Sequence, residues 1–339
     1  MIEKILTKVK DSSALEVQFR LGHKTIAKIK SEWLEIDKES LGYSEWEDLK
    51  DLCLQNNDKL TLETKGFVRG VYKSVDQQWL FSFTEHKDCL KAYFSVIPNF
   101  ELSQYIQSPV FWDSLKKSSG LFIVTGQRGQ GKSSLLKDIV SEIKKDSPKL
   151  IAVHGNFSTL SMLNIDSLIH LSEETLAWEP HHPIYDGIDQ FVVDFNSIKN
   201  WEKWIKLCEE GRSVYLTISG LSVENCLEQI ISQIGFQSNL ARRFYQVLNC
   251  ICYQKVIGIK EGAVHEFFIA QQEFKEGLFK MSFAEFKKQH EGEAFKKYFQ
   301  SLNQSIIQAL VRRRIDVKSA FAASEAPDDL DTQLKRMGL

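Results

Sequence analysis

The chain has 339 residues, 43% of them hydrophobic and 26% charged, and its 43 Lys and Arg nearly balance its 45 Asp and Glu. At about 100–200 residues per domain, this length predicts two domains, each able to bury its own core. The formal charge of -2 gives no overall reason to bind nucleic acid. The 22 Phe, 7 Trp and 9 Tyr residues exclude a mainly disordered chain.

The cysteines and the first residues indicate the cellular compartment of the protein. Six cysteines without CxxC spacing indicate reduced thiols rather than a disulfide framework or a zinc site. The first residues lack the apolar core of a signal peptide, and no apolar run approaches the ~20 residues that cross a bilayer. We therefore expect a cytoplasmic protein without direct membrane insertion.

The first hundred residues have a mixed α/β pattern. Apolar residues at helical spacing predict helices over 2–10 and 44–54, the second with Ser44 as N-cap. Alternation and apolar runs predict five strands, over 15–19, 24–29, 60–68, 79–84 and 91–97. A boundary follows near residues 98–120, where a short helix begins around Pro109.

From residue 120 the pattern changes to strands that alternate with helices. Apolar strands are predicted over 121–124, 150–153, 190–193 and 213–218. Helices are predicted over 132–145, 201–210 and 223–234, and the last ~60 residues have a helical pattern. This alternation favours a parallel sheet with right-handed crossovers.

One motif indicates chemistry. Residues 126–133, Gly-Gln-Arg-Gly-Gln-Gly-Lys-Ser, match the phosphate-loop pattern G-x-x-x-x-G-K-[ST] between a predicted strand and helix. The glycines let backbone N–H groups surround phosphates, and the helix N-terminus adds partial positive charge. Lys132 is expected to reach the β- and γ-phosphates, and the Ser133 hydroxyl to ligate Mg²⁺. The sequence therefore predicts ATP and Mg²⁺ as ligands, held by Gly126, Gln127, Arg128, Gly129, Gln130, Gly131, Lys132, Ser133 and Ser134.

Hydrolysis needs further groups, and the usual positions supply few of them. A metal-binding carboxylate, a water-positioning group and an arginine are typical. After the second, third and fourth strands the sequence has His154-Gly155-Asn156, Asp194-Phe195 and Ser219-Gly220. Asp194 is thus the one candidate carboxylate; it could hold Mg²⁺ or simply cap the strand. No arginine lies between Arg128 and Arg212.

With these elements placed, the chain resembles the secretion and pilus motor ATPases of the PilT type. The similarity is collinear over nearly the whole chain and includes the Gly-Leu-Phe-Ile-Val-Thr-Gly approach to the loop at 120–126. Further similar stretches lie at 14–19, 92–98, 209–219, 252–256 and 304–330.

The resemblance implies an α/β fold in two parts: a PAS-like α+β N-terminal domain (1–100), a linker (101–119), a RecA-like P-loop ATPase domain with a parallel sheet (120–275) and a helical C-terminal region (276–339). It also implies a homo-hexamer, or a mixed ring with an active homologous ATPase. An inner-membrane platform protein would be the partner, which would place the protein peripherally at the inner face of the cytoplasmic membrane. No nucleic-acid partner is implied.

The departures from this family fall on catalytic positions. The family's catalytic Glu falls near His154, its Walker B Gly-Glu on Asp194-Phe195, its histidine-box His on Ser219, and its N-domain arginines on Ser82 and Ser95. We therefore predict an ATP-binding subunit with weak or no hydrolysis, a pseudo-ATPase that serves a pilus, secretion or twitching-motility machine. The alternatives are an active retraction motor that uses Asp194 and a scaffold that needs no nucleotide.

Three other clusters have simpler interpretations. His181-His182 is expected to be a solvated loop, because adjacent residues seldom ligate one ion. The basic run 312–314 is expected to end a helix rather than bind nucleic acid. The aromatic residues between Phe283 and Phe299 are expected to pack in a core.

Overall fold

The computed structural model separates the chain into two compact units, one up to Ile97 and one from Tyr105 on. It describes residues 16–29, 32–73, 78–86, 89–97, 105–106, 108–117, 119–145, 150–155, 168–171, 180, 182–194, 200–258, 262–290 and 292–338. The expected helix over 2–10 and the position Asn156 lie outside these residues.

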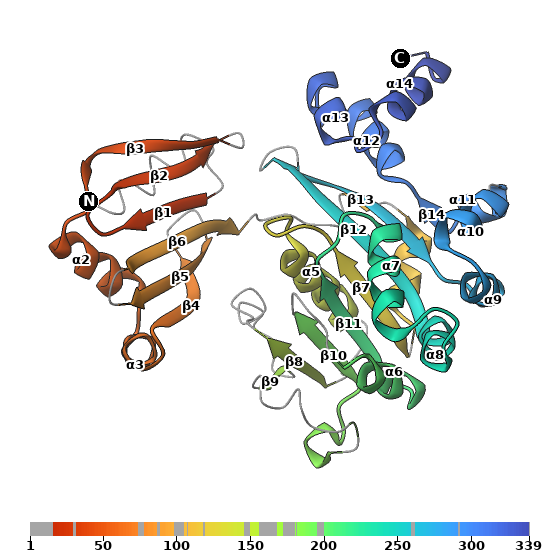
Figure 1. Cartoon of the computed structure of the whole chain (residues 1–339), viewed down its shortest axis with the longest axis horizontal. Helices are drawn as coiled ribbons and strands as arrows, with labels where there is room; N and C mark the ends of the chain where they lie inside the picture. The colour runs from red at the N-terminus through yellow and green to blue at the C-terminus, as the bar shows by residue number, and fades with distance from the viewer. Residues whose placement is uncertain are drawn as a thin grey trace. The chain divides into compact units, whose positions relative to one another are not determined.

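The N-terminal unit is an antiparallel six-stranded sheet with the strand order β3-β2-β1-β6-β5-β4 (Figure 1). Its elements are β1 (Glu16–Arg20), β2 (Lys24–Ile29), β3 (Glu32–Ser40), α2 (Tyr43–Cys53), α3 (Asn56–Lys65), β4 (Phe67–Lys73), β5 (Gln78–His86) and β6 (Cys89–Ile97). Alternate residues of β1, β5 and β6 are buried, among them Phe19, Phe83 and Phe94. Trp46 of α2 packs edge-on against Phe83, with the ring centroids 5.6 Å apart.

Two local predictions for this unit are wrong. The strand expected over 60–68 is instead helix α3 up to Lys65, followed by β4. The carboxylate of Asp58 accepts from the Gln55 N–H at the helix start, and Gly66 ends the helix at φ 73°. The N-cap of α2 is Gly42 rather than Ser44, because Glu45 accepts from the Gly42 N–H at 2.7 Å. In both cases a carboxylate three residues into the helix fixes its start.

The C-terminal unit contains an eight-stranded sheet with the order β14-β13-β12-β7-β11-β10-β8-β9. Its strands are β7 (Gly120–Thr125), β8 (Ile151–Gly155), β9 (Leu168–Leu171), β10 (Gln190–Asp194), β11 (Ser213–Ile218), β12 (Leu248–Gly258), β13 (Gly262–Ile269) and β14 (Phe299–Gln300). The strands from β12 through β9 are parallel, whereas β13 and β14 pair antiparallel. The expected α/β class is confirmed: the N-terminal unit has an antiparallel sheet, and the C-terminal unit has a mostly parallel sheet with helices.

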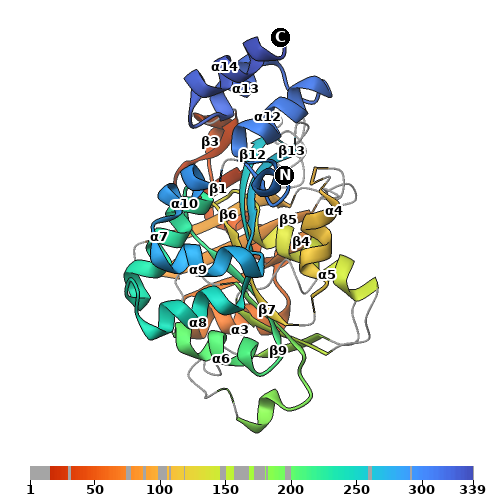
Figure 2. The same cartoon turned by 90° about the vertical axis from the view of Figure 1, so that its right-hand side faces the viewer.

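Helices cover both faces of this sheet. Figure 2 shows α4 and α5 on one side and α6 to α10 on the other. The helices are α4 (Pro109–Leu115), α5 (Lys132–Lys145), α6 (Trp201–Glu209), α7 (Val223–Ile234), α8 (Asn239–Val247), α9 (Gln272–Lys280), α10 (Phe283–Gln289), α11 (Glu293–Lys296), α12 (Leu302–Val311), α13 (Val317–Ala323) and α14 (Pro327–Arg336). We call the α4–α5 side the loop face and the α6–α10 side the far face. The expected helix over 132–145 coincides with α5.

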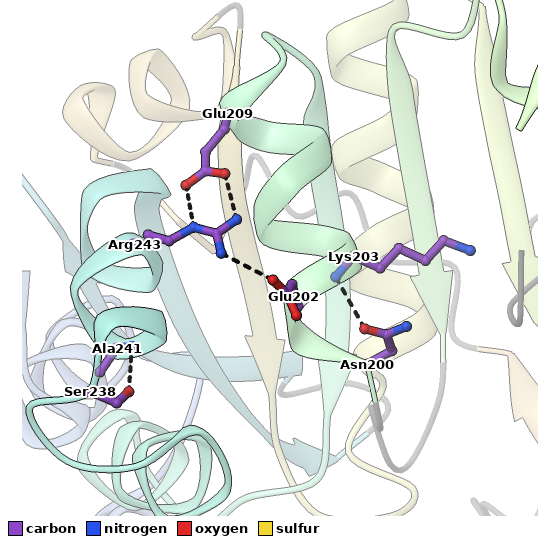
Figure 3. A network of polar contacts seen from close by, with 7 residues as sticks. All are labelled: Asn200, Glu202, Lys203, Glu209, Ser238, Ala241 and Arg243. Carbon is purple, nitrogen blue, oxygen red and sulfur yellow. Dashed lines mark hydrogen bonds and ion pairs between the residues drawn. The ribbon is translucent and has the colours of Figure 1, made fainter. Parts of the chain in front are cut away.

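Helices α6 and α8 are joined on the far face by a polar network (Figure 3). Arg243 of α8 donates to both carboxylate oxygens of Glu209 at 2.8 Å and to Glu202 at 3.3 Å, both on α6. Each helix is capped by a side chain that accepts an N–H of its first turn, Asn200 for α6 and Ser238 for α8. These contacts hold the helical layer that covers β10 and β11.

Candidate nucleotide-binding site

The predicted phosphate loop joins the buried strand β7 to helix α5. Strand β7 ends at Thr125, and α5 begins at Lys132, directly after Gly131. Gly129 and Gly131 adopt left-handed conformations, with φ of 82° and 74°, which favour glycine. The loop therefore lies at the carboxyl edge of the parallel strands, directly before the N-terminus of α5, where the helix adds partial positive charge.

Lys132 lies folded against the loop itself. Its ammonium donates to the carbonyl oxygens of Gly126, at 2.8 Å, and Gln127, at 3.0 Å, and the residue is only 8% exposed. Gln127 and Arg128 are exposed, whereas Ser133 and Ser134 are half-buried in the first turn of α5. The Lys132 ammonium therefore lies inside the curve of the loop, bonded to its backbone.

Strand β12 braces the loop from one side. The Gln254 side chain donates to the Gln130 carbonyl at 2.6 Å, and the Val256 N–H donates to the Gln130 side-chain oxygen, also at 2.6 Å. A Cβ on Gly131 would lie 2.6 Å from Gln254 Nε2, and one on Gly126 would lie 2.7 Å from the Gln254 carbonyl oxygen. Gly126 and Gly131 are thus both required by this contact, and Gly131 also by its left-handed conformation. Gln254 could not be recognised from the sequence as part of the site, because it is 124 residues from Gln130 and only the pairing of strands brings the two together.

Asp194 lies at the same carboxyl edge as the loop. It is the last residue of β10 and pairs with Thr217 of β11, which in turn pairs with Val124 of β7. Two strand spacings of about 4.8 Å place its backbone about 10 Å from β7. The backbone register therefore places Asp194 at the same edge of the sheet as the phosphate loop.

The end of β11 is attached to the start of the loop. The Gly220 N–H donates to the Gly126 carbonyl at 3.4 Å, and a Cβ on Gly220 would lie 2.5 Å from Thr125 Oγ1. Half-buried Ser219, which the resemblance predicts at a histidine-box position, lies directly before this contact. The close approach leaves room only for glycine after Ser219.

His154 lies beneath the far face. Its ring is fully buried against Tyr185, Phe191 and Trp204, with centroids 5.7–6.3 Å apart. Burial, with a smaller contribution from the charge of Lys203, lowers its pKa to about 3. The imidazole is therefore neutral at physiological pH and packs in the core under α6.

A buried carboxylate that the sequence analysis did not single out lies on β13. Glu266 accepts from the Val223 N–H at 2.9 Å, at the first residue of α7. Burial raises its pKa to about 7. Since Glu266 pairs with Tyr253, the neighbour of Gln254 on β12, its side chain lies on the opposite face of the sheet from Gln254. Glu266 therefore satisfies the first N–H of α7, next to the N-cap residue Ser222.

Three further sequence hypotheses have outcomes in the described residues, whereas His181 of the predicted His181-His182 loop lies outside them. Phe283, Phe286 and Phe295 are buried in one aromatic cluster, so the packing prediction is confirmed. Helix α12 ends at Val311, as expected for a helix-end basic run, although the Arg314 guanidinium is half-buried over the Tyr105 ring at 4.7 Å. All six cysteines are free thiols, as predicted.

Metal clusters and membrane spans are not features of the described residues. This part of the chain holds no group of three or more His, Cys, Asp or Glu residues placed to bind a metal ion. Within the same residues, no helix is both long and apolar enough to cross a membrane.

Nearly the whole chain is similar in fold to solved structures of a pilus retraction motor and of the ATPase DotB. The pilus retraction motor PilT with bound ADP has a TM-score of 0.71 at 15% identity, over 98% of this chain and 99% of that one. The ATPase DotB of Legionella pneumophila has a TM-score of 0.68 at 16% identity, over 94% of each chain. DotB of Yersinia pseudotuberculosis has a TM-score of 0.70 at 14% identity, over 95% and 92%. No family model and no curated protein sequence matches the chain. The similarity therefore establishes a shared two-domain fold.

Proposed function

We propose that the protein binds ATP with Mg²⁺ through residues 126–134 and acts as a hydrolysis-impaired subunit of a pilus or secretion motor. The loop geometry is the observation that carries this proposal. Two left-handed glycines, the start of α5 and a buried Lys132 form a cradle that suits a polyphosphate. Ser133 and Asp194 would hold the metal ion, which would neutralise phosphate charge when bound.

Impaired hydrolysis is supported by the groups at the strand ends. The position expected for a catalytic glutamate falls on or next to His154, which packs neutral in the far-face core. At the end of β11 the sequence has Ser219 and Gly220, neither of which can take or deliver a proton near neutral pH. Binding without efficient turnover is the behaviour that these residues favour.

The assembly is part of the same proposal. We expect a homo-hexameric ring, or a mixed ring with an active homologous ATPase, that works against an inner-membrane platform protein. The shared fold with PilT, a pilus retraction motor, and DotB supports this assembly. A rise in oligomer mass on adding ATP, measured by analytical ultracentrifugation, would support a ring.

A second candidate is an active motor in which Asp194 is the metal-binding carboxylate. The register that brings Asp194 to the carboxyl edge beside β11 favours it. This candidate predicts ATP turnover at the rate of a working motor, and its loss in Asp194→Ala.

One titration and one turnover assay separate these functions. We expect wild-type protein to bind ATP with micromolar affinity and Lys132→Ala to bind at least about a hundredfold more weakly, equivalent to about 2.8 kcal/mol. Lys137→Ala, on the same helix, is the matched control and should bind normally. Binding without turnover supports the pseudo-ATPase, and turnover that Asp194→Ala removes supports the active motor. Absence of wild-type binding would leave only the nucleotide-independent scaffold.

A further inference from the structure

A buried chain of side chains leads from the phosphate loop across the β12–β13 hairpin. Gln254 and His265 are paired residues of this hairpin and are 2% and 0% exposed. His265 Nε2 lies 3.1 Å from Gln254 Oε1, and Gln254 Nε2 lies 2.6 Å from the Gln130 carbonyl. These two contacts therefore link the loop to β13, the strand on the other side of β12.

The direction of each hydrogen bond is fixed by its neighbour. A carbonyl oxygen only accepts, so the atom of Gln254 that faces Gln130 must be the amide nitrogen. The amide oxygen of Gln254 then faces His265, whose Nε2 must carry the proton. A reversed Gln254 amide would place two oxygens against each other at the loop. The tautomer of His265 thus selects the Gln254 orientation that can hold the loop.

His265 is itself held in one state. Its backbone N–H donates to Ser305 Oγ on α12 at 3.0 Å, and its backbone carbonyl accepts from the Gln300 side chain at 3.2 Å. Burial lowers the pKa of the ring to about 3, and the positive charge of Arg314 adds to this effect. Among the described residues, no group accepts a hydrogen bond from His265 Nδ1, so nothing there favours the tautomer with its proton on Nδ1. The imidazole therefore stays neutral with its proton on Nε2.

We propose that Gln254 is a positioning residue for the phosphate loop and that His265 sets its orientation. The inference rests on the proposed function, because a nucleotide is what the positioned loop would hold. Gln254 does not touch the nucleotide in this proposal. It fixes the Gln130 carbonyl outward, so that the N–H groups of Gly131 and Lys132 stay aimed at the phosphates.

The test uses the full-length chain with two measurements, hydrogen exchange of the loop peptide without nucleotide and ATP affinity. Gln254→Met removes the donor at similar volume and should speed loop exchange and weaken ATP binding, each about tenfold, for one lost hydrogen bond. Gln130→Met, at a half-buried position, removes the bond from Val256 and should act in the same direction if Gln254→Met fails to fold. His265→Phe should weaken binding about threefold, and His265→Gln, whose amide can donate, should restore it to within twofold.

Gln300→Met is the matched control. It removes the hydrogen bond that the Gln300 side chain donates to the His265 backbone carbonyl, which does not face the loop. The free energy of unfolding should therefore fall, while hydrogen exchange of the loop and ATP affinity stay unchanged. Unchanged loop exchange in both Gln254→Met and Gln130→Met would overturn the inference even if the wild type binds ATP. If the wild type binds no ATP but loop exchange is still faster in both variants, the positioning role is supported and the proposed function is refuted.

Discussion

The two halves of the sheet's carboxyl edge use different chemistry. Around β7 and β12, the contacts are hydrogen bonds of amide and backbone groups: Gln254 and the Val256 N–H of β12 donate to Gln130 of the loop. Around β8 and β10, the far-face side chains include Phe191, which packs with Trp204 of α6, and His154 lies buried and neutral beside both rings. Holding a phosphate depends mainly on backbone geometry, whereas splitting it depends on charged side chains. One half can therefore be preserved while the other changes to a packing role.

The largest expected effect tests the half of the edge around β7 and β12. Gly131→Ala should weaken ATP binding at least about a hundredfold, because the new Cβ at φ 74° would meet Gln254 Nε2 at 2.6 Å. Gly187, before β10, has nearly the same φ of 73°, but a Cβ there would meet no described residue within 4 Å. Gly187→Ala should cost only the backbone strain, about 1 kcal/mol, with unchanged affinity. Equal losses of affinity, measured by calorimetry, would refute the bracing by β12.

The next effect tests the half around β8 and β10 through the pH dependence of unfolding. The pKa of His154 is lowered in the fold, so stability is present above its ordinary pKa near 6.5 and is lost as pH falls toward about 3. In this range the unfolded chain binds a proton that the folded chain does not. His154→Leu removes this difference. The free energy of unfolding of the wild type should fall between pH 7.5 and pH 5. In His154→Leu this fall should be smaller by about 2 kcal/mol, measured by urea denaturation.

Nucleotide affinity makes the His154 experiment specific. ATP affinity at pH 7.5 should be equal in wild type and His154→Leu, because the ring faces the α6 layer. A large loss of affinity or turnover in His154→Leu would instead place His154 at the reacting phosphates and refute the comparison of the two halves.

Much of the C-terminal unit could be predicted from sequence because its signals are local. Strand β11, helix α5 and helix α7 have the predicted bounds, since a buried parallel strand is an apolar run and each helix carries its own periodicity. The motif at 126–133 predicted a strand–loop–helix for the same reason. Strand β3 and the β12–β13 hairpin were not predicted. Most residues of β3 are exposed, and β13 is buried throughout, so neither strand shows alternation.

The site was predictable only where its residues are contiguous. Lys132 and Gly131 follow from one motif, but Gln254 reaches the loop from 124 residues away through sheet pairing. The far-face position of His154 depends on strand register, because a shift by one residue would turn its ring to the loop face. Short motifs therefore predict the cradle, whereas the groups that brace it require the fold.

The smallest expected effect concerns the helices that cover the second half. Arg243→Ala should lower the free energy of unfolding by about 1 kcal/mol, because its two bonds to Glu209 are partly exposed to solvent (Figure 3). Together with Glu209→Ala and the double variant it forms a cycle whose coupling energy isolates the pair. That coupling should decrease in high salt, and ATP affinity should not change in any of the variants. A coupling near zero would mean that α6 and α8 are held by their apolar contacts alone, and altered affinity would mean that the far face influences the loop.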